Sequence, residues 1–296
     1  IGIRLQGSGD LAGARDVVLA MLPEIPDARL TCEILRSGQI SRIQADLRGE
    51  SWAELADPRN LSIEGRLENG RVYIPWIDLD LHGVSGDALI AGAILEGRDV
   101  KARYKGTEGE NGSLRIGLSR ADPVLQLAID ARADLADLPP LLARIVPDPA
   151  FRREVAQLQE FSGTARGTLR LDGTHTDVAV AVQASELDVT ARHQRIAHPL
   201  RFKGGEAAYD GDSIVLRGVD VAVGASRLFK HNLTLGLHGD QALDSSSPKA
   251  VIDLAELFDQ FRDRPPFNHL RRLNGILATG DWRLNGLAFD PATWKL

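Results

Sequence analysis

The feature that most constrains the fold of this chain is a two-residue alternation of apolar and polar side chains. In residues 61–83, LSIEGRLENGRVYIPWIDLDLHG, Leu, Ile and Val alternate with Glu, Arg and Asp. Successive side chains of a strand point to opposite faces, so the pattern predicts strands with one buried and one solvated face. Antiparallel sheets have such faces, whereas parallel sheets, buried on both sides, read as continuous apolar runs.

Turn signals are expected to divide this pattern into short strands. Asn69 and Gly70 form the strongest hairpin signal, and Ser37 and Gly38 are expected to separate two short runs. Strands of roughly 5–8 residues would make a sheet about 16–26 Å wide. In residues 87–97, DALIAGAILEG, both faces carry apolar residues, so the alternation assigns no inward phase there. The pattern returns in residues 113–118, 125–131, 177–191, 212–224 and 232–239.

Three helical segments are expected between the strands. Residues 11–22 form one helix, and prolines divide residues 134–161 into two, the second carrying Val155 and Leu158. Residues 251–263 show the best amphipathic pattern. Its apolar stripe is Val251, Leu254, Leu257, Phe258 and Phe261, with Asp253, Glu256 and Asp259 expected on the solvated side.

A repeated phrase points to large modules. Each copy is an acidic helical stretch followed by a strand that ends in glycine. The copies are residues 52–58, 134–140 and 253–259, with Gly70, Gly173 and Gly286. This spacing is too irregular for a tight solenoid, so we expect modules of a helix plus a multistranded meander. Their approximate bounds are 1–133, 134–252 and 253–296, and chance similarity in a chain rich in Leu and Gly is the alternative.

Composition excludes several kinds of partner and site. The net charge is −6 and the basic residues are scattered, which argues against nucleic acid, because phosphate binding needs concentrated Lys and Arg. The single cysteine, Cys32, excludes a disulfide framework and is expected to be a small apolar filler. No run approaches the about 18 apolar residues of a membrane span. The chain begins IGIRLQGSGD, without Met or a signal peptide, so we expect a piece of a longer protein.

The sequence contains no motif for catalysis, metal binding or cofactor binding. Residues 7–13, GSGDLAG, match neither a P-loop nor the GxGxxG fingerprint, and no HExxH or Cys pair occurs. Asp78 and Asp80 are expected on the outer face of a sheet rather than as an acid–base pair. We therefore expect no enzyme and no cofactor; a hydrolase would need a carboxylate pair or a nucleophile in a cleft. The histidines, all expected on a polar face or in a loop, are His82, His175, His193, His198, His231, His238 and His269.

The apolar face of the sheet is the remaining candidate for function. Packed against protein, it would be an ordinary core. Left open, it would be an apolar trough, which soluble proteins avoid unless something apolar occupies it. Acyl chains would fit, since each buried CH₂ contributes about 0.8 kcal/mol without directional bonds. The residues alone leave both readings open.

Two segments carry a resemblance to a known family. They are residues 61–92, LSIEGRLENGRVYIPWIDLDLHGVSGDALIAG, and residues 200–224, LRFKGGEAAYDGDSIVLRGVDVAVG. Their strand pattern resembles that of the AsmA-like family of bridge-like lipid transfer proteins of diderm bacteria, over about residues 40–290. The resemblance implies a mainly β fold: an extended, twisted antiparallel sheet curled into a half-open groove of repeating modules, with a few short amphipathic helices.

The resemblance also implies a function. The apolar groove would conduct phospholipid acyl chains, or another acyl-chain lipid, across the periplasm between the inner and outer membranes. The full-length protein would be anchored in the inner membrane, and the fragment itself would be soluble. The alternative is a non-catalytic structural or interaction scaffold of the cell envelope, with a closed core and no lipid. The expected groove-lining residues are Leu61, Ile63, Leu67, Val72, Ile74, Ile77, Leu79, Leu81, Leu114, Ile116, Leu118, Leu125, Leu127, Ile129, Leu169, Leu171, Val178, Val180, Val182, Leu187, Val189, Leu233, Leu235 and Leu237.

Overall fold

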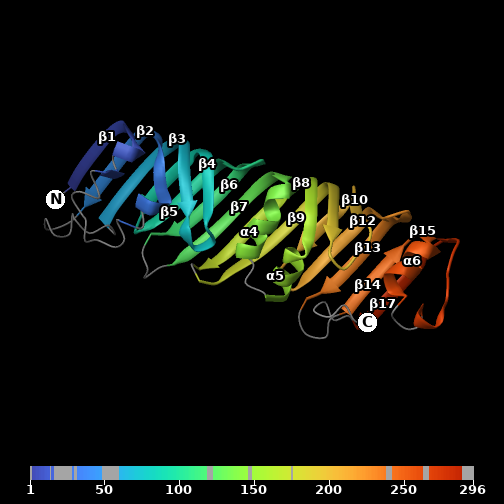
Figure 1. Ribbon diagram of the computed structural model, residues 1–296. Coiled ribbons are helices and arrows are strands. Elements are labelled where there is room, and N and C mark those ends of the chain that lie inside the picture. Colours follow the sequence, from blue (N-terminus) through green and yellow to red (C-terminus); the bar gives the residue numbers. More distant parts are fainter. Residues whose placement is uncertain are drawn as a thin grey trace. The chain divides into compact units, whose positions relative to one another are not determined.

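The fold is mainly β, as the alternation predicts. The computed structural model describes residues 2–13, 15–16, 29, 32–48, 60–118, 123–145, 149–174, 176–237, 242–262 and 267–288. The described residues contain 17 strands in one antiparallel sheet (Figure 1). The chain divides into two compact units, residues 1–131 with 168–179 (unit 1) and residues 132–167 with 180–296 (unit 2). Strands β7, β8 and β9 contribute residues to both units.

Unit 1 is built from strands that follow one another in a meander. Consecutive strands from β1 to β6 pair antiparallel, and a short 3₁₀ turn, η2 (Pro75–Ile77), joins β3 to β4. The strands are β1 (Gly2–Asp10), β2 (Leu35–Arg48), β3 (Leu61–Ile74), β4 (Leu79–Ala91), β5 (Ile94–Tyr104), β6 (Thr107–Gly117) and β7 (Val124–Asp134).

Unit 2 adds short helices to a similar meander. Its strands are β8 (Leu158–Thr174), β9 (Val178–His193), β10 (Leu200–Lys203), β11 (Glu206–Tyr209), β12 (Ser213–Val223), β13 (Ser226–Gly236), β14 (Ala242–Ser247), β15 (Lys249–Asp253), β16 (Ile276–Thr279) and β17 (Trp282–Ala288). Its helical elements are η3 (Leu135–Asp137), α4 (Leu138–Ile145), α5 (Pro149–Ala156), α6 (Leu254–Phe261) and η4 (Phe267–His269). Figure 1 shows α4 and α5 (green) lying across strands of this unit.

Asn69 and Gly70 form a β-bulge, so the hairpin expected there is wrong. Strand β3 is continuous, and Asn69 lies inside it with a φ of 50°. From Leu67 to Gly70 strand β3 advances three residues while its partner β4 advances two, and the pairing with β2 shifts in the same way. In a bulge, two residues of one strand lie opposite a single residue of its partner, so the bulged strand has one extra residue. The chain turns later, at η2.

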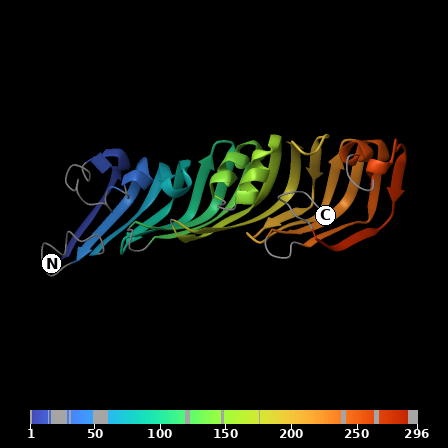
Figure 2. The ribbon, with the colours of Figure 1, turned by 60° about the horizontal axis from the view of Figure 1, so that its bottom comes forward.

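Bulges of this kind occur in most of the strands. Positive φ angles, the mark of such positions, occur within the described strands at Arg42, Gly83, Asp99, Asn111, Glu160, Glu186, Gly218 and Lys230. A bulge bends its strand and increases the local twist. Figure 2 accordingly shows the strands of unit 1 (blue to green) bending along their length.

The bulges also explain why the expected strand lengths were too short. Ser37 and Gly38 lie inside β2, which spans 14 residues, and β8 and β9 span 17 and 16 residues. Asn and Gly are favoured wherever the backbone is left-handed, whether in a bulge inside a strand or in a turn between strands. The sequence alone therefore does not separate the two. Each bulge shifts the alternation by one residue, so the buried phase of β3 runs through Leu67 before the bulge and Val72 after it.

Two expected helix boundaries are also corrected. Leu158 is the first residue of β8, not part of a helix, and Val251 lies in β15. Helix α6 begins after Asp253, whose carboxylate accepts hydrogen bonds from the second and third helical N–H groups (2.9 and 3.1 Å). Such an N-cap ends the preceding strand and starts the helix. Glu256, expected on a solvated face, instead accepts the backbone N–H of Ala225 (3.0 and 2.9 Å).

The structure contains a repeat that differs from the expected one. Strand β7 leads through the Asp134 cap into η3 and α4, and β15 leads through the Asp253 cap into α6. Gly70 is in β3, Gly173 in β8 and Gly286 in β17, which are the first described strand after residues 52–58, the first after α5 and the second after α6. Residues 52–58 lie outside the described residues. The expected module bounds remain a prediction.

Candidate functional site

The most prominent feature of unit 1 is an apolar hollow on the inner face of its sheet, the face that carries the buried aliphatic side chains. The hollow has about 630 Å³ of unfilled space, part of it open to solvent. It is lined by Leu11, Leu35, Ile40, Ile63, Gly65, Leu67, Val72, Val84, Ser85, Gly86, Asp87, Ala88, Ile90, Leu95, Gly97, Val100 and Leu114.

Five neighbouring strands position this lining. The inner residues of β2 to β6 come together because the strands pair in sequence, as with Ile63 of β3 opposite Ile90 of β4. Leu11, in the helical residues 11–13 after β1, adds a side chain from outside the sheet. Asp10 holds the start of that turn, since its carboxylate accepts the N–H of Gly13 (3.1 Å). The lining is therefore aliphatic apart from Ser85 and Asp87.

The hollow adjoins a closed core. Ile74 and Ile116, on the same inner face, are 0% exposed, whereas the lining residues Ile63 and Ile90 are half-buried. The inner face of unit 1 is thus packed against protein in one part and hollowed in another. Both alternatives left open by the sequence are represented within one unit.

The structure places the expected groove residues in three groups. Ile63, Leu67, Val72 and Leu114 line the hollow. Buried residues, including three of these four, are Leu67, Val72, Ile74, Ile77, Leu79, Leu114, Ile116, Leu118, Leu125, Leu127, Leu171, Val180, Leu187 and Val189. Half-buried residues are Ile63, Leu81, Ile129, Leu169, Val178, Val182, Leu233, Leu235 and Leu237. The side chain of Leu61 is outside the description.

Sequence reasoning missed several lining residues. Ala88, Ile90 and Leu95 lie in the run whose inward phase the alternation could not assign. The register decides it, because Ile90 pairs with both Ile63 of β3 and Leu95 of β5. The sequence signal for these lining residues is Gly83 itself. Its positive φ shifts the inward phase of β4 by one residue.

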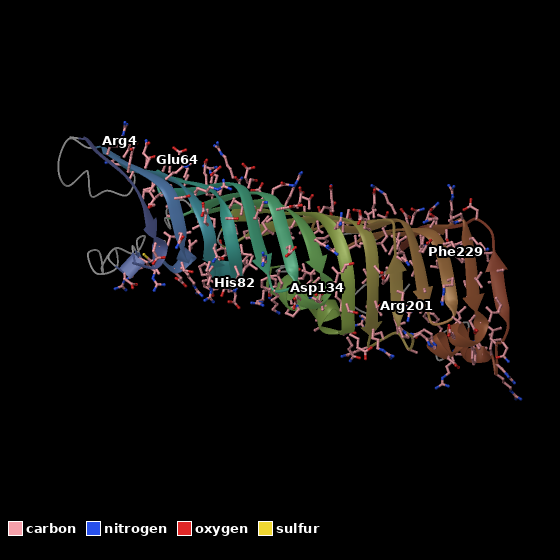
Figure 3. All side chains as sticks on the ribbon, turned by 90° about the horizontal axis from the view of Figure 1, so that it is seen from above. Arg4, Glu64, His82, Asp134, Arg201 and Phe229 are labelled. Atoms are coloured by element: carbon pink, nitrogen blue, oxygen red, sulfur yellow. The ribbon has the colours of Figure 1, made fainter. Side chains whose placement is uncertain are left out.

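The outer face of the sheet carries charged side chains in cross-strand pairs. Arg66 pairs with Asp87 (3.1 Å), and in unit 2 Arg192 pairs with Glu160 (2.7 Å). Opposite charges on facing strands stabilise the sheet modestly. Figure 3 shows the side chain of Glu64 pointing away from the curved sheet. Asp87 also borders the hollow and is the one charged residue of its described lining.

Asp78 and Asp80 do not form a carboxylate pair for catalysis. Asp78 ends η2 and accepts the Tyr73 hydroxyl (3.0 Å), so it lies in the turn and not on the strand face expected for it. Asp80 accepts hydrogen bonds from Arg71, and these bonds lower the pKa of its carboxyl. Each carboxylate thus has its own partner.

Two histidines are buried, contrary to the expectation for all seven. His193 and His231 are 7% and 6% exposed, on the inner face of β9 and β13. Burial lowers the pKa of His231, although a hydrogen bond to the Ser246 backbone opposes the shift. Its ring stacks on Trp282 at 6.0 Å. His175 and His238 lie outside the described residues.

Other reactive groups do not gather into a site. Within the described ranges, no three His, Cys, Asp or Glu side chains are placed to share a metal ion. Burial raises the pKa of the half-buried Cys32 thiol, which lowers its thiolate fraction. The hollow is thus the best-defined candidate site.

Comparison of the chain with protein-family models, with curated proteins and with solved structures finds no match in any of the three. Among the described helices, none has the length and apolar character needed to cross a membrane.

Proposed function

We propose that unit 1 binds the acyl chain of a lipid in its apolar hollow. The observation that carries this proposal is the composition of the lining, which is aliphatic on five neighbouring strands while the charged side chains lie on the opposite face. An acyl chain gains about 0.8 kcal/mol for each CH₂ that it buries there. Because the described lining of the hollow includes no Lys or Arg, a lipid headgroup would stay outside it and would contribute little to selection.

Binding can be measured with cis-parinaric acid, a fatty acid that fluoresces in apolar surroundings. We expect a saturable rise in fluorescence with the intact chain, and lipid that co-purifies with the protein in native mass spectrometry. Absence of both signals would overturn the proposal.

Photocrosslinking locates the bound chain. A benzoylphenylalanine in place of Ile90, which lines the hollow, should crosslink to lipid. The same residue in place of Arg115, an exposed outer-face position on β6, is the matched control. Equal crosslinking at both positions would contradict binding in the hollow.

We propose in addition that the chain belongs to a lipid-transfer protein of the AsmA-like type, periplasmic and anchored in the inner membrane in its full-length form. The support is the similarity in strand pattern. The test is transfer of fluorescent phosphatidylethanolamine between donor and acceptor vesicles by the full-length protein. No acceleration over protein-free vesicles would overturn this wider proposal and leave acyl binding by unit 1 standing.

A structural module of the cell envelope is the second candidate, and the packing of unit 2 favours it. Leu187, Val189, Val219 and Val221 form part of a buried cluster there. A chain that binds no lipid but retains a cooperative unfolding transition would have the properties of such a module.

A further inference from the structure

The two units share one backbone framework, which the strand registers align residue by residue. The pair β5–β6 in unit 1 and the pair β12–β13 in unit 2 have the same register at an offset of 119 residues (216 minus 97). Gly97–Leu114 corresponds to Leu216–Leu233, and Val100–Gly112 corresponds to Val219–His231. Ala102–Gly109 corresponds to Val221–Leu228. The helix caps Asp134 and Asp253 have this offset too.

The bulges coincide in the two copies. Asp99 and Gly218, again 119 residues apart, have φ angles of 50° and 62°. Asn69 of β3 and Glu186 of β9 have φ angles of 50° and 52°, at an offset of 117 residues (186 minus 69). With that offset for β3, and one of 121 residues (209 minus 88) for β4, the pairs of β3–β4 correspond to those of β9 with β10 and β11. Gly65–Ala88 corresponds to Val182–Tyr209, and Leu67–Gly86 corresponds to Ala184–Ala207. Val72–Leu81 corresponds to Val189–Phe202.

Side-chain size differs between the copies at positions that line the hollow. Gly65 corresponds to Val182 and Gly97 to Leu216, so two wall positions without side chains in unit 1 are branched aliphatics in unit 2. Gly86 and Ala88 likewise correspond to larger residues, Ala207 and Tyr209. Leu67 is the opposite case, since its counterpart, Ala184, is smaller.

Two of the larger side chains of unit 2 pack against its buried cluster. Leu216 and Ala207 contact the buried cluster that contains Val219 and Val221. The space next to these strands is therefore occupied by the chain's own side chains. In unit 1 the corresponding wall is bare at Gly97.

Adding side chains at the two glycines of unit 1 would change the hollow directly. A Cβ at Gly65 would lie 2.6 Å from Cγ2 of Ile40, and one at Gly97 would lie 2.9 Å from Cγ2 of Val100. Both neighbours line the hollow, so a side chain at either glycine must displace part of that lining. Neither glycine has a positive φ, so a side chain meets no backbone strain there.

We propose that Gly65 and Gly97 are the specificity-determining residues of the unit 1 site, and that Val182 and Leu216 close the corresponding place in unit 2 to the same ligand. The ligand is the aliphatic tail of an acyl chain, so this inference rests on the proposed function. The same strand framework thus holds an acyl chain in unit 1 and a packed core in unit 2, depending on these residues.

A reciprocal exchange tests the inference. The variant Gly65→Val/Gly97→Leu carries the unit 2 residues in unit 1, and Val182→Gly/Leu216→Gly carries the unit 1 residues in unit 2. We expect the first to bind cis-parinaric acid about ten-fold more weakly or worse, the loss that follows when roughly two methylene groups lose their place. We expect the second to bind additional cis-parinaric acid per chain.

Gly7→Val is the control, because a Cβ at this exposed position of β1 meets nothing within 4 Å. Gly97→Ala, with a smaller added group, should lose affinity to a lesser degree and keeps the test valid if the double variant does not fold, which circular dichroism reports. Wild-type chain that neither binds cis-parinaric acid nor carries co-purifying lipid overturns the proposed function. Wild-type binding that persists unchanged in folded Gly97→Ala and Gly65→Val/Gly97→Leu overturns this inference alone.

Discussion

Gly97 and Leu216 occupy the same position in two copies of one strand pair, 119 residues apart. Gly97 lines an apolar hollow, and Leu216 packs against a buried cluster. The backbone around them is alike, with a bulge two residues later in each strand. The two positions thus share a strand register and differ in side-chain volume.

The segregation of apolar and charged faces predicts unequal effects of truncation on stability. Ile116→Ala, at a position that is 0% exposed, should lower the free energy of unfolding by about 2–5 kcal/mol. Arg66→Ala, which removes an exposed pair with Asp87, should lower it by less than about 1 kcal/mol. Urea unfolding followed by circular dichroism measures both. Similar losses would mean that Ile116 is not part of a packed core.

The bulge in β3 predicts a conformational preference at Asn69. With a φ of 50°, Asn69→Val should destabilise the chain by about 1–2 kcal/mol, because a β-branched side chain clashes in the left-handed region. Asn69→Gly should be close to neutral, because glycine adopts this region freely. The comparison needs only the urea midpoints of the two variants. A Val variant as stable as the Gly variant would contradict the bulge.

Burial of His231 predicts a loss of stability in mild acid. Its pKa is lowered in the folded chain, so between this pKa and the unfolded value of about 6.5 the unfolded chain binds more protons. The free energy of unfolding should therefore fall as the pH drops below about 6.5, by up to about 1.4 kcal/mol per pH unit. The measurement is chemical denaturation between pH 5 and 7.5. His231→Gln should remove this component, whereas His82→Gln, at an exposed site, should retain it.

The cap of α6 predicts a local effect. Asp253→Ala removes the carboxylate that accepts two helical N–H groups and should cost about 1 kcal/mol. Asp253→Asn keeps an acceptor and should lose much less. Hydrogen exchange of the α6 amides is the readout, and Asp259→Ala, on the exposed side of the helix, is the control. Unchanged exchange in the Ala variant would show that the cap does not hold the helix.

The sequence predicts the buried face of a strand correctly where the two-residue alternation runs without a bulge. The alternation in residues 113–118 places Leu114, Ile116 and Leu118 on one side, and all three are buried. It failed at Asn69, because a bulge and a hairpin both need a residue that tolerates positive φ. Only pairing of β3 on both sides with β2 and β4 distinguishes them. A local signal contains no information about those partners.

The candidate site shows the same division. Ile63, Leu67, Val72 and Leu114 were expected to line a groove, and they line the hollow. Buried positions such as Ile74 carry an identical strand pattern, because an apolar side chain alternates in the same way whether protein or solvent faces it. Histidine burial was missed for a similar reason, since the apolar neighbours of His231 come from other strands.

The sequence by itself determined a one-sided antiparallel sheet, because the side-chain period of a strand is a local property of the chain. The tertiary structure alone decided which turn signals became bulges and which residues of the apolar face met protein. Register and bulge position depend on strands far apart in sequence, as in the pairing of Ile63 with Ile90. Several such pairings bring Gly65, Gly86 and Gly97 into the lining of the hollow, and no single segment encodes that coincidence.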